Sequence, residues 1–83
     1  MSNKIEKIVS KMKQSNKGWD FESCMKVLLE IGYEMKPGKG DHFKFFKKGM
    51  FLIVIARHRP VSPDAVNDVL DAWDNNLKGE DYD

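Results

Sequence analysis

The 83-residue chain is long enough for one small domain, and its 41% hydrophobic and 33% charged residues are ordinary for a globular protein rather than a disordered one. The net charge of +1 excludes a uniformly basic protein, and the single cysteine, Cys24, excludes an intrachain disulfide and fits a reducing cytoplasm. The longest apolar run, MFLIVIA, has seven residues, far below the roughly 20 of a membrane-spanning helix.

Charge is segregated along the chain in spite of the small net value. Residues 36–59 contain seven Lys or Arg against one Asp, a local charge of +6. Residues 60–83 contain one Lys against seven acidic residues, a local charge of −6. A basic middle followed by an acidic end predicts two surfaces of opposite sign, of which only the first would attract a polyanion.

Two helices are expected in the first part of the chain. Apolar residues recur at helical spacing over residues 3–14, at Ile5, Ile8, Val9 and Met12. After a break at residues 15–18, Asp20 can cap a second helix that ends at Gly32. The apolar side of this helix is predicted to consist of Phe21, Met25, Leu28 and Leu29.

Three strands are expected next, at residues 33–36, 41–47 and 50–56. Pro37 and two glycines predict a turn at residues 37–40, and Lys48-Gly49 predicts a hairpin turn. The strand at 50–56 has the strongest pattern and is expected to be the central one. Alternation in the second strand places Asp41, Phe43, Phe45 and Lys47 on one face and His42, Lys44 and Phe46 on the other.

A final helix is expected to begin at Pro63, with Ser62 as its cap. Its apolar side is predicted to consist of Val66, Val69, Leu70, Trp73 and Leu77. We expect one domain over residues 1–83, with a core at about 17–77 and a frayed acidic tail at 78–83. The element order predicts an α+β fold, in which helices cover one face of a three-stranded antiparallel sheet and His42 and Lys44 face water.

Three motifs together resemble the HicA family of toxin–antitoxin toxins over roughly residues 17–75. These motifs are LLEIGYE before a short strand, GKGDHFKF at a glycine-flanked turn, and the basic loop and capped helix ARHRPVSPDAVNDVL. The resemblance implies a double-stranded-RNA-binding-domain-like fold and an mRNA-cleaving toxin that a HicB-like antitoxin neutralises. It also implies that His42 is the catalytic residue. The chain departs from the family in Phe43, where many members have a second histidine, in its acidic last helix and in the added helix at 3–14.

The chemistry of RNA cleavage suits a histidine in this place. RNA carries its own nucleophile, because a base that removes the 2′-hydroxyl proton lets that oxygen attack the adjacent phosphorus, so neither a metal nor a cofactor is expected. Imidazole exchanges protons near neutral pH and is a suitable general base or acid. The alternative is that His42 is an exposed strand histidine without a role. Asp41 is expected on the opposite face and is therefore not expected to orient His42.

Two basic clusters are candidates for binding RNA phosphates, and both also have a purely structural interpretation. The first consists of Lys39, Gly40 and Lys44 around the turn; the lysines there, with Lys47 and Lys48, could instead be solvated hairpin charges. The second consists of Arg57, His58 and Arg59, before the N-terminus of the last helix. His58 could be the acid partner of His42 or pack within its loop, and Phe46 could stack on a base or pack at the sheet edge.

Three functions are therefore left open by the sequence. The first is an endoribonuclease toxin whose partners are mRNA and a HicB-like antitoxin. The second is a domain that binds double-stranded RNA without cleaving it, although four aspartates in the last helix oppose this. The third is a protein-interaction module.

Overall fold

Three helices and one three-stranded sheet make up the part of the chain that the structure describes. The computed structural model describes residues 3–58 and 60–81, and only the backbone of residue 3 and of residues 77–81. The elements follow in the order α1 (Asn3–Gln14), α2 (Phe21–Glu30), β1 (Glu34–Pro37), β2 (His42–Phe46), β3 (Ile53–Ala56) and α3 (Pro63–Asp81). The predicted α+β class and element order are confirmed.

Both predicted helix caps are present. The Asp20 carboxylate accepts a hydrogen bond from the backbone N–H of Ser23 at 3.2 Å, and the Ser62 hydroxyl accepts one from Ala65 at 3.2 Å. These side chains satisfy N–H groups that the first turn of a helix leaves unpaired. The last helix continues to Asp81, past the predicted end at residue 77, because nothing between these positions breaks it beyond a single glycine.

The sheet is an antiparallel meander in the order β1-β2-β3. The expectation that residues 50–56 form the central strand is wrong, since β2 is central and β3 lies at an edge. The run is apolar because Ile53 and Ile55 point into the core, while Val54 between them is 45% exposed. In a three-stranded meander the second strand of the chain is always the central one, even when the third strand is more apolar.

The connection between β2 and β3 is longer than the predicted two-residue turn. A turn at 48–49 does form, closed by a 2.9 Å hydrogen bond from the N–H of Met50 to the carbonyl of Lys47. Strand pairing resumes only at Ile53, because residues 50–52 leave the ladder and the carbonyl of Phe51 accepts a hydrogen bond from the Tyr33 hydroxyl at 2.9 Å.

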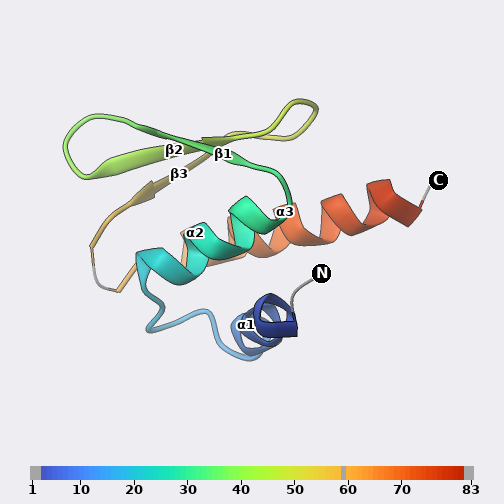
Figure 1. The fold of residues 1–83 in the computed structure, drawn as a ribbon. Coiled ribbons are helices and arrows are strands. Elements are labelled where there is room, and N and C mark those ends of the chain that lie inside the picture. The colour runs from blue at the N-terminus through green and yellow to red at the C-terminus, as the bar shows by residue number, and fades with distance from the viewer. Residues whose placement is uncertain (1–2, 59, 82–83) are drawn as a thin grey trace.

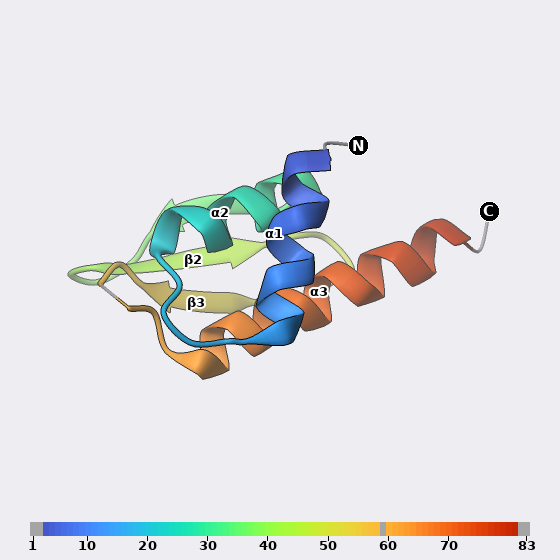
Figure 2. The same cartoon turned by 90° about the horizontal axis from the view of Figure 1, so that it is seen from below.

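The elements form three layers (Figure 1). The sheet is one outer layer, α2 and α3 pack against its inner face, and α1 lies across α2 and α3 on the side away from the sheet, as Figure 2 shows from below. None of the described helices covers the outer face of the sheet, as the sequence predicted, and none is long and apolar enough to cross a membrane.

The core lies between the sheet and the helices and between α1 and the other two helices. Among the residues expected there, Phe21, Phe45 and Trp73 are buried, and Trp19 and Phe43 are partly buried against the core. Leu29 is an exception and is 46% exposed. It lies about 100° around the helix from the buried Leu28, outside the buried stripe of α2.

Candidate functional site

His42 is held at the first position of β2 by a tight turn. The N–H of Gly38 donates to the carbonyl of His42 at 2.7 Å, and the N–H of His42 donates to the carbonyl of Lys39 at 3.0 Å. A Cβ on residue 38 would lie 3.0 Å from the His42 carbonyl oxygen, and Gly40 has a φ of +60°. Both glycines therefore serve the turn, and the His42 backbone is fixed while 57% of its side chain is exposed.

Asp41 lies beside His42, contrary to the sequence-based expectation. The Asp41 Oδ1 atom is 3.4 Å from His42 Nδ1, and both side chains are exposed. The expectation was wrong because Asp41 precedes β2 and belongs to the turn, where strand alternation no longer determines the direction of a side chain. A carboxylate at this atom favours a proton on Nδ1, which leaves Nε2 as the acceptor.

The outer face of the sheet carries further groups in register with His42. Residues directly opposite one another on paired strands share a face, so Lys36 of β1 and Val54 of β3 flank Lys44. By the same registers this face, which we call the open face, consists of Glu34, Lys36, His42, Lys44, Phe46, Val54 and Ala56. The Lys36 Nζ atom lies 5.3 Å from the centre of the Phe46 ring, a cation–π contact.

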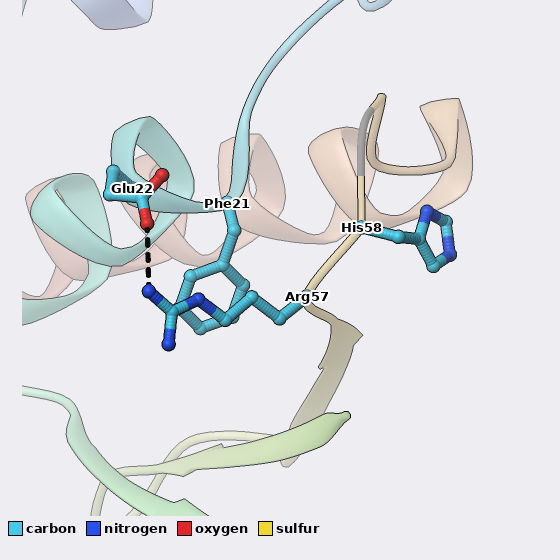
Figure 3. Close-up of a pocket in the computed structure, with 4 residues that line it drawn as sticks. All are labelled: Phe21, Glu22, Arg57 and His58. Atoms are coloured by element: carbon cyan, nitrogen blue, oxygen red, sulfur yellow. Dashed lines mark ion pairs between the residues drawn. The ribbon is translucent and has the colours of Figure 1, made fainter. Parts of the chain in front are cut away.

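Arg57 is brought to the same end of the sheet as His42. Its N–H donates to the carbonyl of Asp41 at 2.7 Å, and β3 ends with Ala56 paired to His42. Figure 3 shows its guanidinium over the ring of Phe21, 5.8 Å from the ring centre, and next to Glu22, whose carboxylate is 3.5 Å away. The backbone of Arg57 is thus tied to the turn before His42, while its side chain lies against α2.

His58 contributes to a shallow pocket but is directed away from the other charged groups there. The pocket is lined by Phe21, Glu22, Arg57 and His58. The His58 ring points away from the Arg57–Glu22 pair in Figure 3, and its Nδ1 atom lies 3.1 Å from the carbonyl of Pro60. This contact supports the loop-packing interpretation of His58. Arg59, the third member of the cluster, lies outside the described residues.

The remaining lysines of the predicted clusters differ in their surroundings. Lys39 and Lys48 are exposed in the turns before and after β2. Lys47 is half-buried, and its Nζ atom donates to the carbonyl of Ile31 and to Asn76 Oδ1, each at 2.6 Å. Lys47 is therefore a structural lysine and not a solvated hairpin charge. Its predicted position on the inner face was the signal for this role.

Three residues that shape this region were not among the predicted site residues. Glu22 and Phe21 position the Arg57 guanidinium, and Lys36 contacts Phe46 from the neighbouring strand. No local pattern identifies such partners, because each contact joins different elements. Within the described residues, no group of three or more His, Cys, Asp or Glu is arranged to hold a metal ion.

The arrangement presents an exposed imidazole at His42, with the Asp41 carboxylate beside it and the exposed Lys44 on the same face of β2. Comparison of the chain with protein-family models, with curated proteins and with solved structures gives no match.

Proposed function

We propose that this chain is a metal-independent endoribonuclease that cleaves mRNA in the cytoplasm, with a double-stranded-RNA-binding-domain-like fold. We also propose that it is the toxin of a type II toxin–antitoxin system and that a HicB-like antitoxin neutralises it. The observation that carries the nuclease proposal is the exposed imidazole of His42, next to Asp41 and on the same face of β2 as Lys44. The HicA-like motifs are the basis for the toxin and its partner.

In this reaction His42 acts first as a base. Its Nε2 atom removes the proton of a ribose 2′-hydroxyl, the 2′-oxygen forms a bond to the adjacent phosphorus, and the bond from phosphorus to the 5′-oxygen breaks. The products are a 2′,3′-cyclic phosphate and a 5′-hydroxyl, so the 5′-oxygen must receive a proton. The imidazolium of His42 carries the proton that it has just accepted and returns it to the leaving 5′-oxygen, directly or through a water molecule, which regenerates the neutral base.

Cations near His42 stabilise the charge that develops on the phosphoryl oxygens. Lys44 lies two residues along the same strand face and Lys39 is in the turn, whereas Arg57 reaches this end of the sheet through its backbone and holds its guanidinium over Phe21 of α2. The Arg57–Glu22 ion pair is 60% and 42% exposed at its two side chains, so solvent screens it. A pair of this kind contributes about 0–1 kcal/mol, and a phosphate can replace the carboxylate at the guanidinium.

The test is cleavage of an mRNA by the purified chain in excess EDTA. We expect fragments that end in a 2′,3′-cyclic phosphate and begin with a 5′-hydroxyl, and we expect His42→Ala to lower the rate by roughly 10²–10⁴-fold. Lys48→Ala is a matched surface control that should keep the wild-type rate, since Lys48 lies in the other hairpin turn. Expression without an antitoxin should arrest growth for the wild type and not for His42→Ala.

Equal cleavage by the wild type and His42→Ala would contradict the proposal, as would activity that EDTA abolishes. The alternative function is a non-catalytic RNA-binding or protein-interaction module of the same fold. Binding of RNA without cleavage by the wild type would favour that alternative. His58→Ala decides a separate point, because a loss close to that of His42→Ala would make His58 the acid partner.

A further inference from the structure

We propose that the open face of the sheet binds an unpaired segment of RNA, with Phe46 stacked on a base and Lys36 and Lys44 at the flanking phosphates. The inference rests on the proposed function and deepens it, because it makes single-stranded RNA the substrate class. The observation that carries it is the position of an aromatic ring, two lysines and His42 on one uncovered face.

The open face has the apolar surface that base stacking needs. Phe46 is only partly buried there, and Val54, on the neighbouring strand, is 45% exposed. Every base has an apolar face, so an aromatic side chain that is accessible on a sheet can stack on unpaired bases of any sequence. In a duplex the same base faces are stacked on each other, and a sheet cannot reach them.

Charge selects an RNA strand over other occupants of this face. Lys36 and Lys44 are register partners at its centre, and Glu34 is the one carboxylate among its described residues. The exposed aspartates of α3, Asp64, Asp68 and Asp71, belong to the helical layer below the sheet. A polyanion is therefore attracted to the sheet and repelled by α3, one of the helices with which a duplex-binding domain would grip its ligand.

The strand also sets a spacing between the stacking residue and the proposed catalytic residue. His42 and Phe46 point to the same side of β2 and are four residues apart, about 14 Å along an antiparallel strand. Lys44 lies between them. A strand of RNA that follows β2 thus presents one ribose to His42 while a base further along stacks on Phe46.

The contact between Lys36 and Phe46 is compatible with this role. In the free protein the Lys36 Nζ atom lies over the Phe46 ring, 5.3 Å from its centre, so the exposed lysine side chain swings off the ring when a base stacks there and can then reach an adjacent phosphate. Among the described residues, neither Lys36 nor Lys44 forms an ion pair with a carboxylate, and both lysines are exposed. An incoming phosphate therefore does not have to displace an acidic side chain from them.

The experiment measures binding of the wild-type chain to a fluorescent 2′-O-methyl oligoadenylate. The 2′-O-methyl group removes the nucleophile, so binding is measured apart from cleavage. Two further probes are the duplex of this strand with its complement and an abasic strand of the same length. We expect tightest binding to the unpaired strand with bases and weaker binding to both the duplex and the abasic strand.

Phe46→Ala should weaken binding to the oligoadenylate by roughly 5- to 100-fold and leave binding to the abasic strand unchanged. Phe46→Trp should keep the affinity, and Phe51→Ala, which removes an exposed phenylalanine from the loop before β3, is the matched control and should keep it as well. Lys36→Gln should lower the slope of log affinity against log salt by about 0.7. Phe46→Leu keeps an apolar side chain and reports on stacking if the alanine variant does not fold.

Equal affinity of wild type, Phe46→Ala and Phe46→Leu for the oligoadenylate would overturn the inference, as would tighter binding to the duplex. Self-association of the chain that Phe46→Ala abolishes, with no strand bound, would also overturn it and would make the face a protein interface. The outcome is independent of catalysis. If the wild type cleaves RNA and Phe46→Ala binds the oligoadenylate as tightly as the wild type does, only this inference is refuted. If the wild type binds the strand through its bases but does not cleave RNA, only the nuclease proposal is refuted.

Discussion

The exposed Asp41–His42 pair defines the candidate site at the scale of single residues. Asp41 comes to the Nδ1 side of His42 because it ends a turn, and the same turn directs its carbonyl to the N–H of Arg57 at 2.7 Å. One residue thus contacts the imidazole through its side chain and the second basic cluster through its backbone. In the proposed reaction Asp41 is a positioning residue and does not touch the substrate.

Asp41→Asn should lower the cleavage rate much less than His42→Ala does. An exposed ion pair is worth about 0.2–1 kcal/mol, so we expect kcat to fall by less than about tenfold. KM should not rise, because the substitution removes a negative charge from a site for phosphate. Steady-state kinetics check this split, with Glu6→Gln on the exposed side of α1 as the control. A rise in KM with kcat unchanged would show that Asp41 acts in binding.

At the scale of elements, Lys47 links three parts of the fold. It follows β2, and its ammonium binds the carbonyl of Ile31 at the C-cap of α2 and the Asn76 side chain of α3. A cation at the C-terminal end of a helix is favoured by the helix dipole and satisfies a carbonyl that has no partner within the helix. The contact fixes the end of α2 against both β2 and α3.

Lys47→Met should lower the free energy of unfolding by about 1–3 kcal/mol. The methionine keeps most of the apolar stem, but it leaves the half-buried carbonyl of Ile31 without its charged donor. Lys48→Met, one residue further on and exposed, is the matched control and should change stability by less than about 0.5 kcal/mol. Denaturant titrations of the three proteins test this, and equal midpoints would show that the Lys47 contacts do not stabilise the fold.

The described aspartates of α3 lie on the side of this helix that does not pack against the sheet. Partial burial, then the neighbouring carboxylates of Asp71 and Asp64, raise the pKa of Asp68 above its usual value. Like charges one turn apart repel each other, which opposes stability slightly. The negative charge of α3 therefore contributes little to stability. Its main effect is to repel a polyanion from the helical side of the molecule.

At the scale of the whole molecule, Cys24 lies at the centre of the packed layers. It is fully buried on α2, and burial, followed by the charge of Asp20, raises the pKa of its thiol from 9.0 to about 12. Such a thiol is a small hydrophobic group and not a nucleophile. A thiol reagent can reach Cys24 only when the packed layers around it open.

The stability difference between the wild type and Cys24→Ala should shrink as pH rises from about 9 to about 12. In this window the unfolded thiol loses its proton while the folded thiol keeps it, so a rising pH favours the unfolded wild type. The alanine variant has no such group and shares all other titrations, so the difference in unfolding free energy isolates the thiol. A difference that stays constant with pH would mean that the thiol is not buried in the folded protein.

Features that depend on near neighbours along the chain were predictable from the amino-acid sequence. Caps at Asp20 and Ser62, the periodicity of the helices and the outward direction of His42 and Lys44 follow from residues a few positions apart. Alternation also placed Phe45 in the core and Lys47 on the inner side of the sheet.

The packing of the whole fold set which segments meet. It made β3 an edge strand, brought Arg57 to the turn before His42 and set Lys36 against Phe46. It also placed Asp41 at the imidazole, since strand alternation applies only while the chain stays in the strand. Local patterns encode the direction of a side chain within its own element, whereas strand register and layer packing bring together residues that no local pattern relates.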